Sequence, residues 1–150
     1  MLTSFDKALL NIVQTDLPLA KRPFAELAAR LGTEEAAVLE RLQYLKDNGY
    51  IRRMGPFFDS TKLGYTGTLV AVKVVPEKLA DVARFINDYP GVTHNYEREG
   101  EFNLWFALLT PDLSLQEQIL ASIGAREGVE KMLNLPATKK YKVSVQFKLE

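Results

Sequence analysis

Cysteine is absent from the 150-residue sequence, and histidine and tryptophan each occur once. Without cysteine the chain cannot form disulfides, use a thiolate nucleophile, or bind zinc or an iron–sulfur cluster through sulfur. A single histidine also excludes a metal site built from several imidazoles. No apolar run approaches the roughly 18 residues of a membrane-spanning helix, and residues 1–7 lack the pattern of a secretory signal. We therefore expect a cytoplasmic protein with no membrane partner.

Neither sign of charge is in excess, because 19 Lys and Arg residues face 19 Asp and Glu residues. A nucleic-acid-binding domain usually carries a basic surplus, since phosphate contacts supply much of its affinity. The balance therefore gives no electrostatic reason to expect nucleic acid or an anionic membrane as a partner. The length of 150 residues suits one or two small domains, each with its own core.

The N-terminal third of the chain has the apolar periodicity of short helices. Three helices are predicted, over residues 6–15, residues 24–31 and residues 33–48. Thr3 or Ser4 suits the N-cap of the first helix, and Gly32 and Gly49 suit the ends of the second and third. The short, glycine-containing connection between the second and third helices predicts a helix-turn-helix.

Two short extended runs follow the third helix, over residues 50–53 and residues 57–59, with Gly55 and Pro56 between them. This arrangement predicts a wing-like hairpin that completes a winged helix-turn-helix. Glycines then mark a joint. We therefore predict a first domain over residues 1–64 and a second over residues 65–150.

The second domain alternates between strand and helix patterns. Strands are predicted over residues 68–75, 92–98, 102–109 and 140–149, and helices over residues 76–89 and 115–123. The order β-α-β-β-α-β is that of ferredoxin-like domains. The predicted fold class is thus α+β, a winged helix-turn-helix followed by a ferredoxin-like βαββαβ domain.

The helix-turn-helix does not have the charge pattern of a DNA reader. Its third helix begins with Glu34 and Glu35, and Glu40 follows, so the end that would face base edges carries carboxylates. Residues 1–64 contain nine Lys and Arg residues against eight Asp and Glu residues. We therefore predict a helix-turn-helix that does not bind DNA.

Three chemically distinct side chains occupy alternate positions of the strand predicted over residues 92–98. His94, Tyr96 and Arg98 share one face, because successive side chains of a strand point to opposite sides. A titratable ring, a phenol and a fixed cation on one face favour a site for an aromatic, anionic ligand. The alternative is a histidine that serves only the structure of a half-buried strand.

The length of the turn after this strand decides which residues of the next strand join that face. A turn of two or four residues brings Asn103 and Trp105 beside His94. A turn of three residues brings Phe102 and Leu104 there instead. The sequence leaves this register open.

A winged helix-turn-helix followed by a βαββαβ domain resembles the Lrp/AsnC family of transcription regulators. Four segments resemble a narrower branch of that family, the siroheme decarboxylase subunits. They are GYIRRMG at residues 49–55, KLGY at residues 62–65, HNYER at residues 94–98 and FNLWF at residues 102–106. The resemblance covers essentially the whole chain.

This resemblance implies an enzyme that removes CO₂ from the acetate side chains at C12 and C18 of siroheme and gives 12,18-didecarboxysiroheme. It also implies a paralogous partner subunit in a heterodimer or higher oligomer. No added cofactor is implied, because the tetrapyrrole substrate carries its own iron. The strand predicted over residues 68–75 is apolar on both faces apart from Lys73, which favours dimerisation through the sheet.

Under this resemblance, the carbon that loses CO₂ must gain a proton, and the candidate catalytic residues for its delivery are His94 and Tyr96. His94 is alternatively an axial ligand to the substrate iron. The candidate substrate-binding residues are Arg98, Arg52, Arg53, Asn103 and Trp105. The arginines suit carboxylates, because a guanidinium matches a carboxylate bidentately.

Two other functions fit the same sequence. The first is an Lrp/AsnC-type transcription regulator that senses a small ligand, which would require salt-dependent DNA binding. The second is a ligand-sensing or haem-binding module without turnover, which would use the same face of His94.

Overall fold

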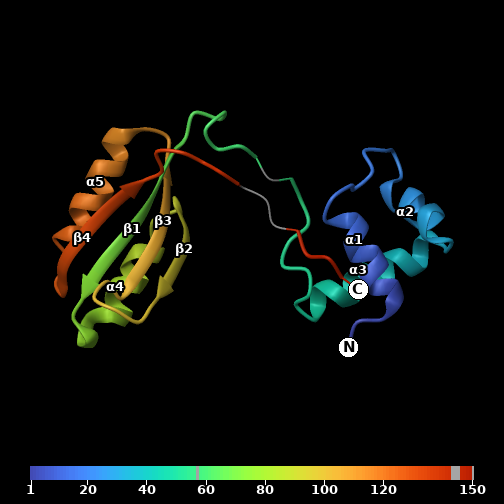
Figure 1. Cartoon of the computed structure of the whole chain (residues 1–150), viewed down its shortest axis with the longest axis horizontal. Helices are drawn as coiled ribbons and strands as arrows, with labels where there is room; N and C mark the ends of the chain where they lie inside the picture. Colours follow the sequence, from blue (N-terminus) through green and yellow to red (C-terminus); the bar gives the residue numbers. More distant parts are fainter. Residues whose placement is uncertain (57, 143–145, 150) are drawn as a thin grey trace. The chain divides into compact units, whose positions relative to one another are not determined.

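The computed structural model describes residues 1–56, 58–142 and 146–149 (Figure 1). The chain forms two compact units, Met1–Pro56 with Lys142–Glu150, and Phe57–Tyr141. The sequence predicts the boundary between domains at residue 64 and places the C-terminal segment in the second domain. In the structure this segment belongs instead to the N-terminal, helical unit.

The helical unit contains the three predicted helices, α1 (Ser4–Val13), α2 (Pro23–Leu31) and α3 (Glu35–Asp47). Their inward faces form one core, made of Leu9, Leu27, Ala28, Val38, Leu42 and Leu45. Thr3 is the N-cap of α1, since its hydroxyl accepts the amide of Asp6 at 3.1 Å. Gly32 ends α2 in the left-handed conformation at φ 64°, which glycine adopts without strain, and the chain turns there into α3.

The predicted wing hairpin is not formed by the described residues between α3 and the first strand. Phe57, part of the predicted second arm, lies outside the described residues. Pro56 has no amide hydrogen to donate to a ladder, which disfavours strand pairing at this point. Asp59 instead caps a turn, because its Oδ1 accepts the amides of Thr61 at 3.0 Å and Lys62 at 3.3 Å.

The second unit is a four-stranded antiparallel sheet with the spatial order β2-β3-β1-β4. The strands are β1 (Thr66–Val74), β2 (Val92–Glu97), β3 (Leu104–Thr110) and β4 (Val129–Pro136). A short 3₁₀ turn, η1 (Pro76–Lys78), leads into α4 (Leu79–Asn87), and α5 (Leu113–Gly124) connects β3 to β4. The predicted α+β class and βαββαβ order are confirmed.

The last strand was predicted in the wrong place, because β4 spans Val129–Pro136 and not residues 140–149. The described part of the later segment lies along α1. Asn11 exchanges two hydrogen bonds with the backbone of Leu149, at 2.9 and 3.2 Å, and Gln14 does the same with Phe147, at 2.7 and 2.8 Å. Its alternating sequence therefore suits an extended segment that pairs with side-chain amides. Residues 143–145 of the predicted strand lie outside the described residues.

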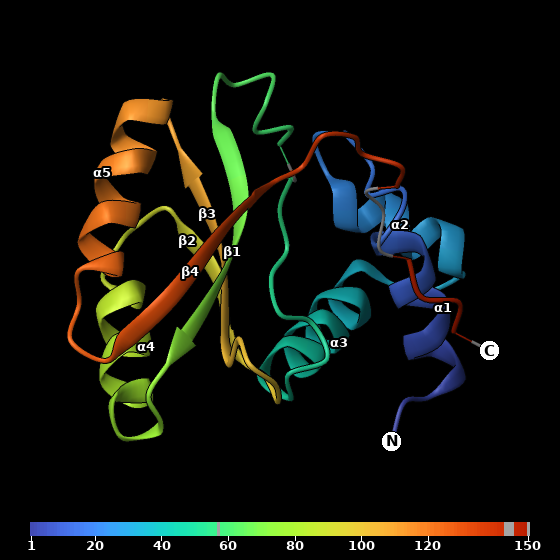
Figure 2. The ribbon, with the colours of Figure 1, turned by 60° about the vertical axis from the view of Figure 1, so that its left-hand side comes forward.

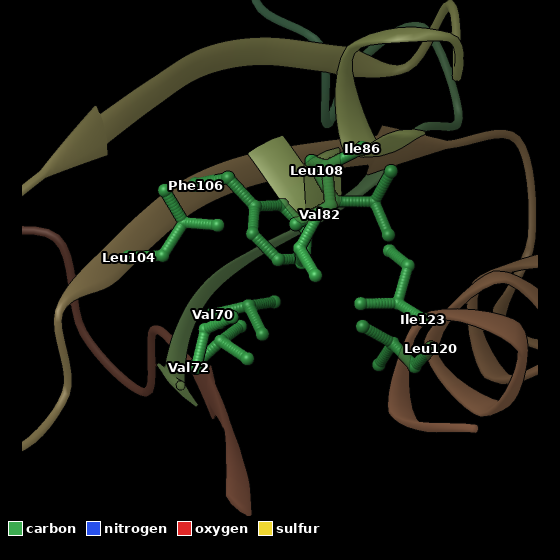
Figure 3. Close-up of a cluster of buried hydrophobic side chains, with 10 residues drawn as sticks. Val70, Val72, Val82, Ile86, Leu104, Phe106, Leu108, Leu120 and Ile123 are labelled. Carbon is green, nitrogen blue, oxygen red and sulfur yellow. The ribbon is translucent and has the colours of Figure 1, made fainter. Parts of the chain in front are cut away.

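Both helices of the second unit cover the same face of its sheet (Figure 2). The core between them is drawn in Figure 3, where β1 and β3 side chains point toward Val82 and Ile86 of α4 and Leu120 and Ile123 of α5. The strand residues of this core are Val70, Val72, Val74, Leu104, Phe106 and Leu108. Among the described residues of this unit, no helix lies over the opposite face of the sheet. Among the described helices, none is both long and apolar enough to span a membrane.

Candidate functional site

Strand β2 divides its side chains between the two faces of the sheet. Asn95 points to the helical side, where its Nδ2 donates to the carbonyl of Ala83 at 3.1 Å and to Oδ1 of Asn87 at 3.0 Å. His94 and Tyr96 therefore lie on the opposite face, which we call the open face. The predicted sharing of one face by these two residues agrees with this geometry.

The hairpin between β2 and β3 has the four-residue turn that the sequence left as one of three possibilities. The amide of Arg98 donates to the carbonyl of Asn103 at 2.9 Å and encloses residues 99–102. In this register Tyr96 pairs with Trp105, and His94 pairs with Ala107 after a bulge in β2. The indole thus lies beside the phenol on the open face.

These residues surround a shallow depression of about 460 Å³ on the open face. Its lining consists of Leu69, His94, Tyr96, Arg98, Trp105, Phe106 and Ala107. The volume falls within the range of small-molecule sites, about 300–1,000 Å³. Aromatic and aliphatic carbon forms the floor, while the imidazole, phenol and guanidinium supply the polar groups. This combination suits a flat, apolar ligand with acidic substituents.

The imidazole of His94 is exposed and contacts two nearby side chains. Its Nδ1 lies 3.1 Å from the Thr93 hydroxyl, and its ring centre lies 6.1 Å from that of Tyr96, with the planes inclined by 36°. Within the described part of the chain, Nε2 has no hydrogen-bond partner. This nitrogen is therefore available to a ligand, either for proton transfer or for coordination.

Arg98 is exposed at the rim of the depression. Among the residues that the structure describes, no carboxylate pairs with its guanidinium. A planar guanidinium without an internal partner can bind a ligand carboxylate through two parallel hydrogen bonds.

Trp105 and Asn103 differ in their relation to the depression. The indole of Trp105 lines it, and its Nε1 donates to the carbonyl of Phe102 at 2.7 Å, which fixes the ring orientation. The amide of Asn103 is absent from the lining. It binds both the amide and the carbonyl of Val74, at 2.9 and 2.8 Å.

Arg52 and Arg53 belong to the helical unit, whereas the depression belongs to the sheet unit. Both arginines are exposed in the segment after α3. The structure therefore brings together four of the seven candidate residues, His94, Tyr96, Arg98 and Trp105, in one depression.

Sequence reasoning missed Leu69 as part of this surface. Leu69 lies on β1, directly between its pairs Ala107 and Leu135, and the residue is 44% exposed although it is apolar. The signal was present, because β1 is apolar on both faces. No group of three or more His, Cys, Asp or Glu residues in the described chain could hold a metal ion.

The fold identifies the class of protein. Residues 62–142 match the AsnC-like ligand binding domain. The structure of AsnC from E. coli covers 97% of this chain and 98% of that chain with a TM-score of 0.82, at 16% sequence identity. At that identity the likeness shows the fold alone, which is a helix-turn-helix unit joined to an AsnC-like domain.

Closer relatives narrow this class. Residues 6–52 match the siroheme decarboxylase NirDL-like HTH domain. The siroheme decarboxylase alpha subunit of Desulfovibrio desulfuricans is 46% identical, over 98% of this chain and 84% of its own length. The crystal structure of siroheme decarboxylase NirDL in complex with an iron-uroporphyrin III analogue is 41% identical, with a TM-score of 0.72 over 95% of this chain. The chain belongs to the siroheme decarboxylase family, and it spans 48% of the crystallised NirDL chain.

Proposed function

We propose that this chain is a subunit of a siroheme decarboxylase that binds its tetrapyrrole on the open face of the sheet. Family membership and the cluster of His94, Tyr96 and Arg98 around one depression support this proposal. The reaction removes CO₂ from the acetate side chains at C12 and C18 of siroheme. The product is 12,18-didecarboxysiroheme.

The lining of the depression suits the two parts of such a substrate. Leu69, Trp105 and Ala107 offer an apolar surface on which a flat macrocycle can lie. Arg98 at the rim binds one of the peripheral carboxylates bidentately. Arg52 and Arg53 remain proposed clamps for further carboxylates, on the basis of the family resemblance.

The chemistry needs one proton for each CO₂ released. The bond between the acetate methylene and its carboxylate breaks, the electron pair passes into the macrocycle, and the methylene carbon gains a proton to become a methyl group. The apolar floor favours this step, since it solvates a localised carboxylate poorly compared with a dispersed charge. His94 and Tyr96 are the lining residues able to deliver the proton. His94 Nε2 is alternatively the axial ligand of the substrate iron.

The open face also supports a partner subunit. Beyond the depression, Leu133 and Leu135 pair with Ala71 and Leu69, and they are 38% and 40% exposed on that face. The relative from D. desulfuricans is named as an alpha subunit, which implies another kind of subunit in that protein. We propose that a paralogous chain packs on this surface and covers the second side of the macrocycle.

The regulator function requires a DNA-binding surface, and the start of α3 does not favour one. Glu34 is its N-cap residue and Glu35 its first residue, and Glu35 forms an ion pair with Arg22. Carboxylates at that end repel phosphates. We propose that no DNA is bound by this unit.

An anaerobic incubation with siroheme tests the function. The chain is incubated alone and with its paralogous subunit, and mass spectrometry follows the loss of CO₂. We expect the loss of two CO₂ molecules per siroheme in the combined sample. No loss in either sample, together with tight DNA binding that weakens steeply with salt, would favour the regulator.

A further inference from the structure

We propose that Asn103 is a positioning residue, whose side-chain amide locks the β2–β3 hairpin to β1 and thereby holds Arg98 at the rim of the depression. This inference rests on the proposed function, since it assigns Arg98 a ligand carboxylate. It differs from the sequence-based prediction, in which Asn103 contacts the substrate directly.

The first observation is an additional pair of hydrogen bonds between β1 and the residue that precedes β3. Backbone pairing between β1 and β3 ends at Val72 and Leu104. Beyond that pair, Asn103 Nδ2 donates to the carbonyl of Val74 at 2.8 Å, and the amide of Val74 donates to Asn103 Oδ1 at 2.9 Å. A carboxamide presents a donor and an acceptor on one edge, as a strand residue does with its own backbone N–H and C=O. The side chain therefore continues the ladder where the backbone of β3 no longer does.

The second observation concerns the backbone of the same residue. The carbonyl of Asn103 accepts the amide of Arg98 at 2.9 Å. Asn103 thus bonds to β1 through its side chain and to the end of β2 through its main chain. In a strand, one residue normally bonds only to the neighbour on one side through its backbone groups. Asn103, which directly precedes β3, therefore bonds both to the end of β1 and to the residue that follows β2. That residue is Arg98.

The carbonyl of Phe102, next to Asn103, accepts the indole Nε1 of Trp105 at 2.7 Å. The two carbonyls that hold Arg98 and Trp105 therefore belong to consecutive residues. The described residues record two further contacts of this turn with the sheet, and Lys131 makes both. They are an exposed ion pair with Glu101 at 3.8 Å and a cation–π contact with the Phe102 ring, whose centre lies 5.4 Å from Nζ. Exposed pairs of that kind contribute little to stability. Among the described residues, the amide of Asn103 is thus the main side-chain hydrogen-bonding restraint on this turn at the rim of the depression.

Substitution of Asn103 tests this role against a matched control. Asn103→Ala leaves the amide and carbonyl of Val74 without their partner, so the turn gains freedom. Asn134→Ala is the control, because Asn134 also bonds across the sheet, accepting the Thr68 hydroxyl at 2.5 Å, but from the helical side and far from the turn. Thr68 keeps its second acceptor, the carbonyl of Leu69 at 3.3 Å.

The sole tryptophan gives a readout that needs no substrate. We expect Asn103→Ala to lower the fluorescence anisotropy of Trp105 and shift its emission, while Asn134→Ala leaves both unchanged. Unchanged emission and anisotropy in Asn103→Ala would overturn the positioning role. This measurement needs no bound tetrapyrrole. It therefore tests the positioning role of Asn103 even if the proposed function is wrong.

A double-mutant cycle then tests whether Asn103 acts through Arg98. The Kd for the iron-uroporphyrin III analogue is measured for Asn103→Ala, Arg98→Ala and the double variant, each assembled with the partner subunit. We expect Asn103→Ala to raise Kd about tenfold in the wild-type background and less than twofold in the Arg98→Ala background. Equal effects in both backgrounds would indicate direct substrate contact. An unchanged Kd with a lowered melting temperature would indicate a structural role only. Either of these results would overturn the proposal.

Discussion

The carboxylate of Asp6 and the guanidinium of Arg41 form a bidentate ion pair that joins α1 to α3. Arg41 Nε donates to Oδ1 at 2.5 Å and Nη2 donates to Oδ2 at 2.8 Å. The Asp6 side chain is fully buried, at 0% exposure, and its Oδ2 also accepts the amide of Thr3 at 2.7 Å. One carboxylate thus caps the first helix and ties it to the third.

Arg41→Ala should destabilise the helical unit strongly. The substitution leaves the buried Asp6 carboxylate without its cation, and a carboxylate buried without a charged partner is strongly destabilising. Urea denaturation followed by circular dichroism measures the free energy of unfolding. Arg30→Ala is the matched control, since its ion pairs with Asp16 and Glu26 are exposed and contribute little to stability. Equal losses for the two variants would contradict a special role of the buried pair.

Stability should also fall in acid because of Asp6. The hydrogen bonds from Arg41 hold the pKa of Asp6 well below its usual range. The folded state therefore binds fewer protons than the unfolded state below the ordinary pKa of about 4. The stabilisation by Asp6 is complete above that pKa and is lost as the pH falls through and below it.

Urea midpoints between about pH 6 and pH 2 measure this dependence. We expect the midpoint of the wild-type protein to decrease below about pH 4, and the decrease to be shallower in Asp6→Asn, which has no carboxylate at this position. Asp16→Asn is the control, because that carboxylate is 71% exposed in its ion pair with Arg30. A wild-type slope retained in Asp6→Asn would place the titrating group elsewhere.

Substitutions on the open face should separate binding from chemistry. Arg98→Ala should weaken binding of siroheme by about 2 kcal/mol, roughly thirtyfold in Kd, because one carboxylate loses its charged partner. Arg84→Ala on α4 is the control, since that guanidinium pairs with Asp81 on the surface. Isothermal titration measures the Kd of both variants. An unchanged Kd for Arg98→Ala would show that another residue binds the substrate carboxylate.

His94→Ala distinguishes the two roles of the imidazole. Loss of a proton donor should lower kcat by about 10²–10⁴ with little change in Kd. Loss of an axial ligand should change the visible spectrum of bound siroheme. Tyr96→Phe removes the phenol hydroxyl and keeps the ring, so a lower kcat in this variant would assign the proton to Tyr96. No change in spectrum, Kd or kcat for both variants would place the catalytic groups on the partner subunit.

Much of the fold was predictable from the sequence, because periodicity reports which side of a segment is buried. This periodicity predicted the three N-terminal helices and the strands β1, β2 and β3. Strand β4 did not, since it is an edge strand whose Leu133 and Leu135 are exposed and whose pattern is weak. The stronger alternation at residues 140–149 belongs to a segment that bonds to Asn11 and Gln14 of α1, and no local pattern distinguishes this from sheet pairing.

The candidate site was predictable where it depended on alternation alone. His94, Tyr96 and Arg98 occupy alternate positions, and all three line the depression. The four-residue turn brings Trp105 to the depression, as predicted for that length, but the amide of Asn103 bonds to Val74 and does not line the depression. Its bonds to Val74 join residues 29 positions apart, so only the folded sheet shows them.

The exposed leucines of the open face should matter for assembly. Leu133→Lys places a charge in an apolar surface that we propose is covered by the partner subunit, and burial of that charge without a partner is unfavourable. We therefore expect the variant to remain folded and to lose the heterodimer, as measured by light scattering after size-exclusion chromatography. Leu113→Lys is the control, since Leu113 is 59% exposed at the start of α5, on the helical side of the sheet. Dissociation by Leu113→Lys, with Leu133→Lys still dimeric, would place the interface on the helices instead of the open face.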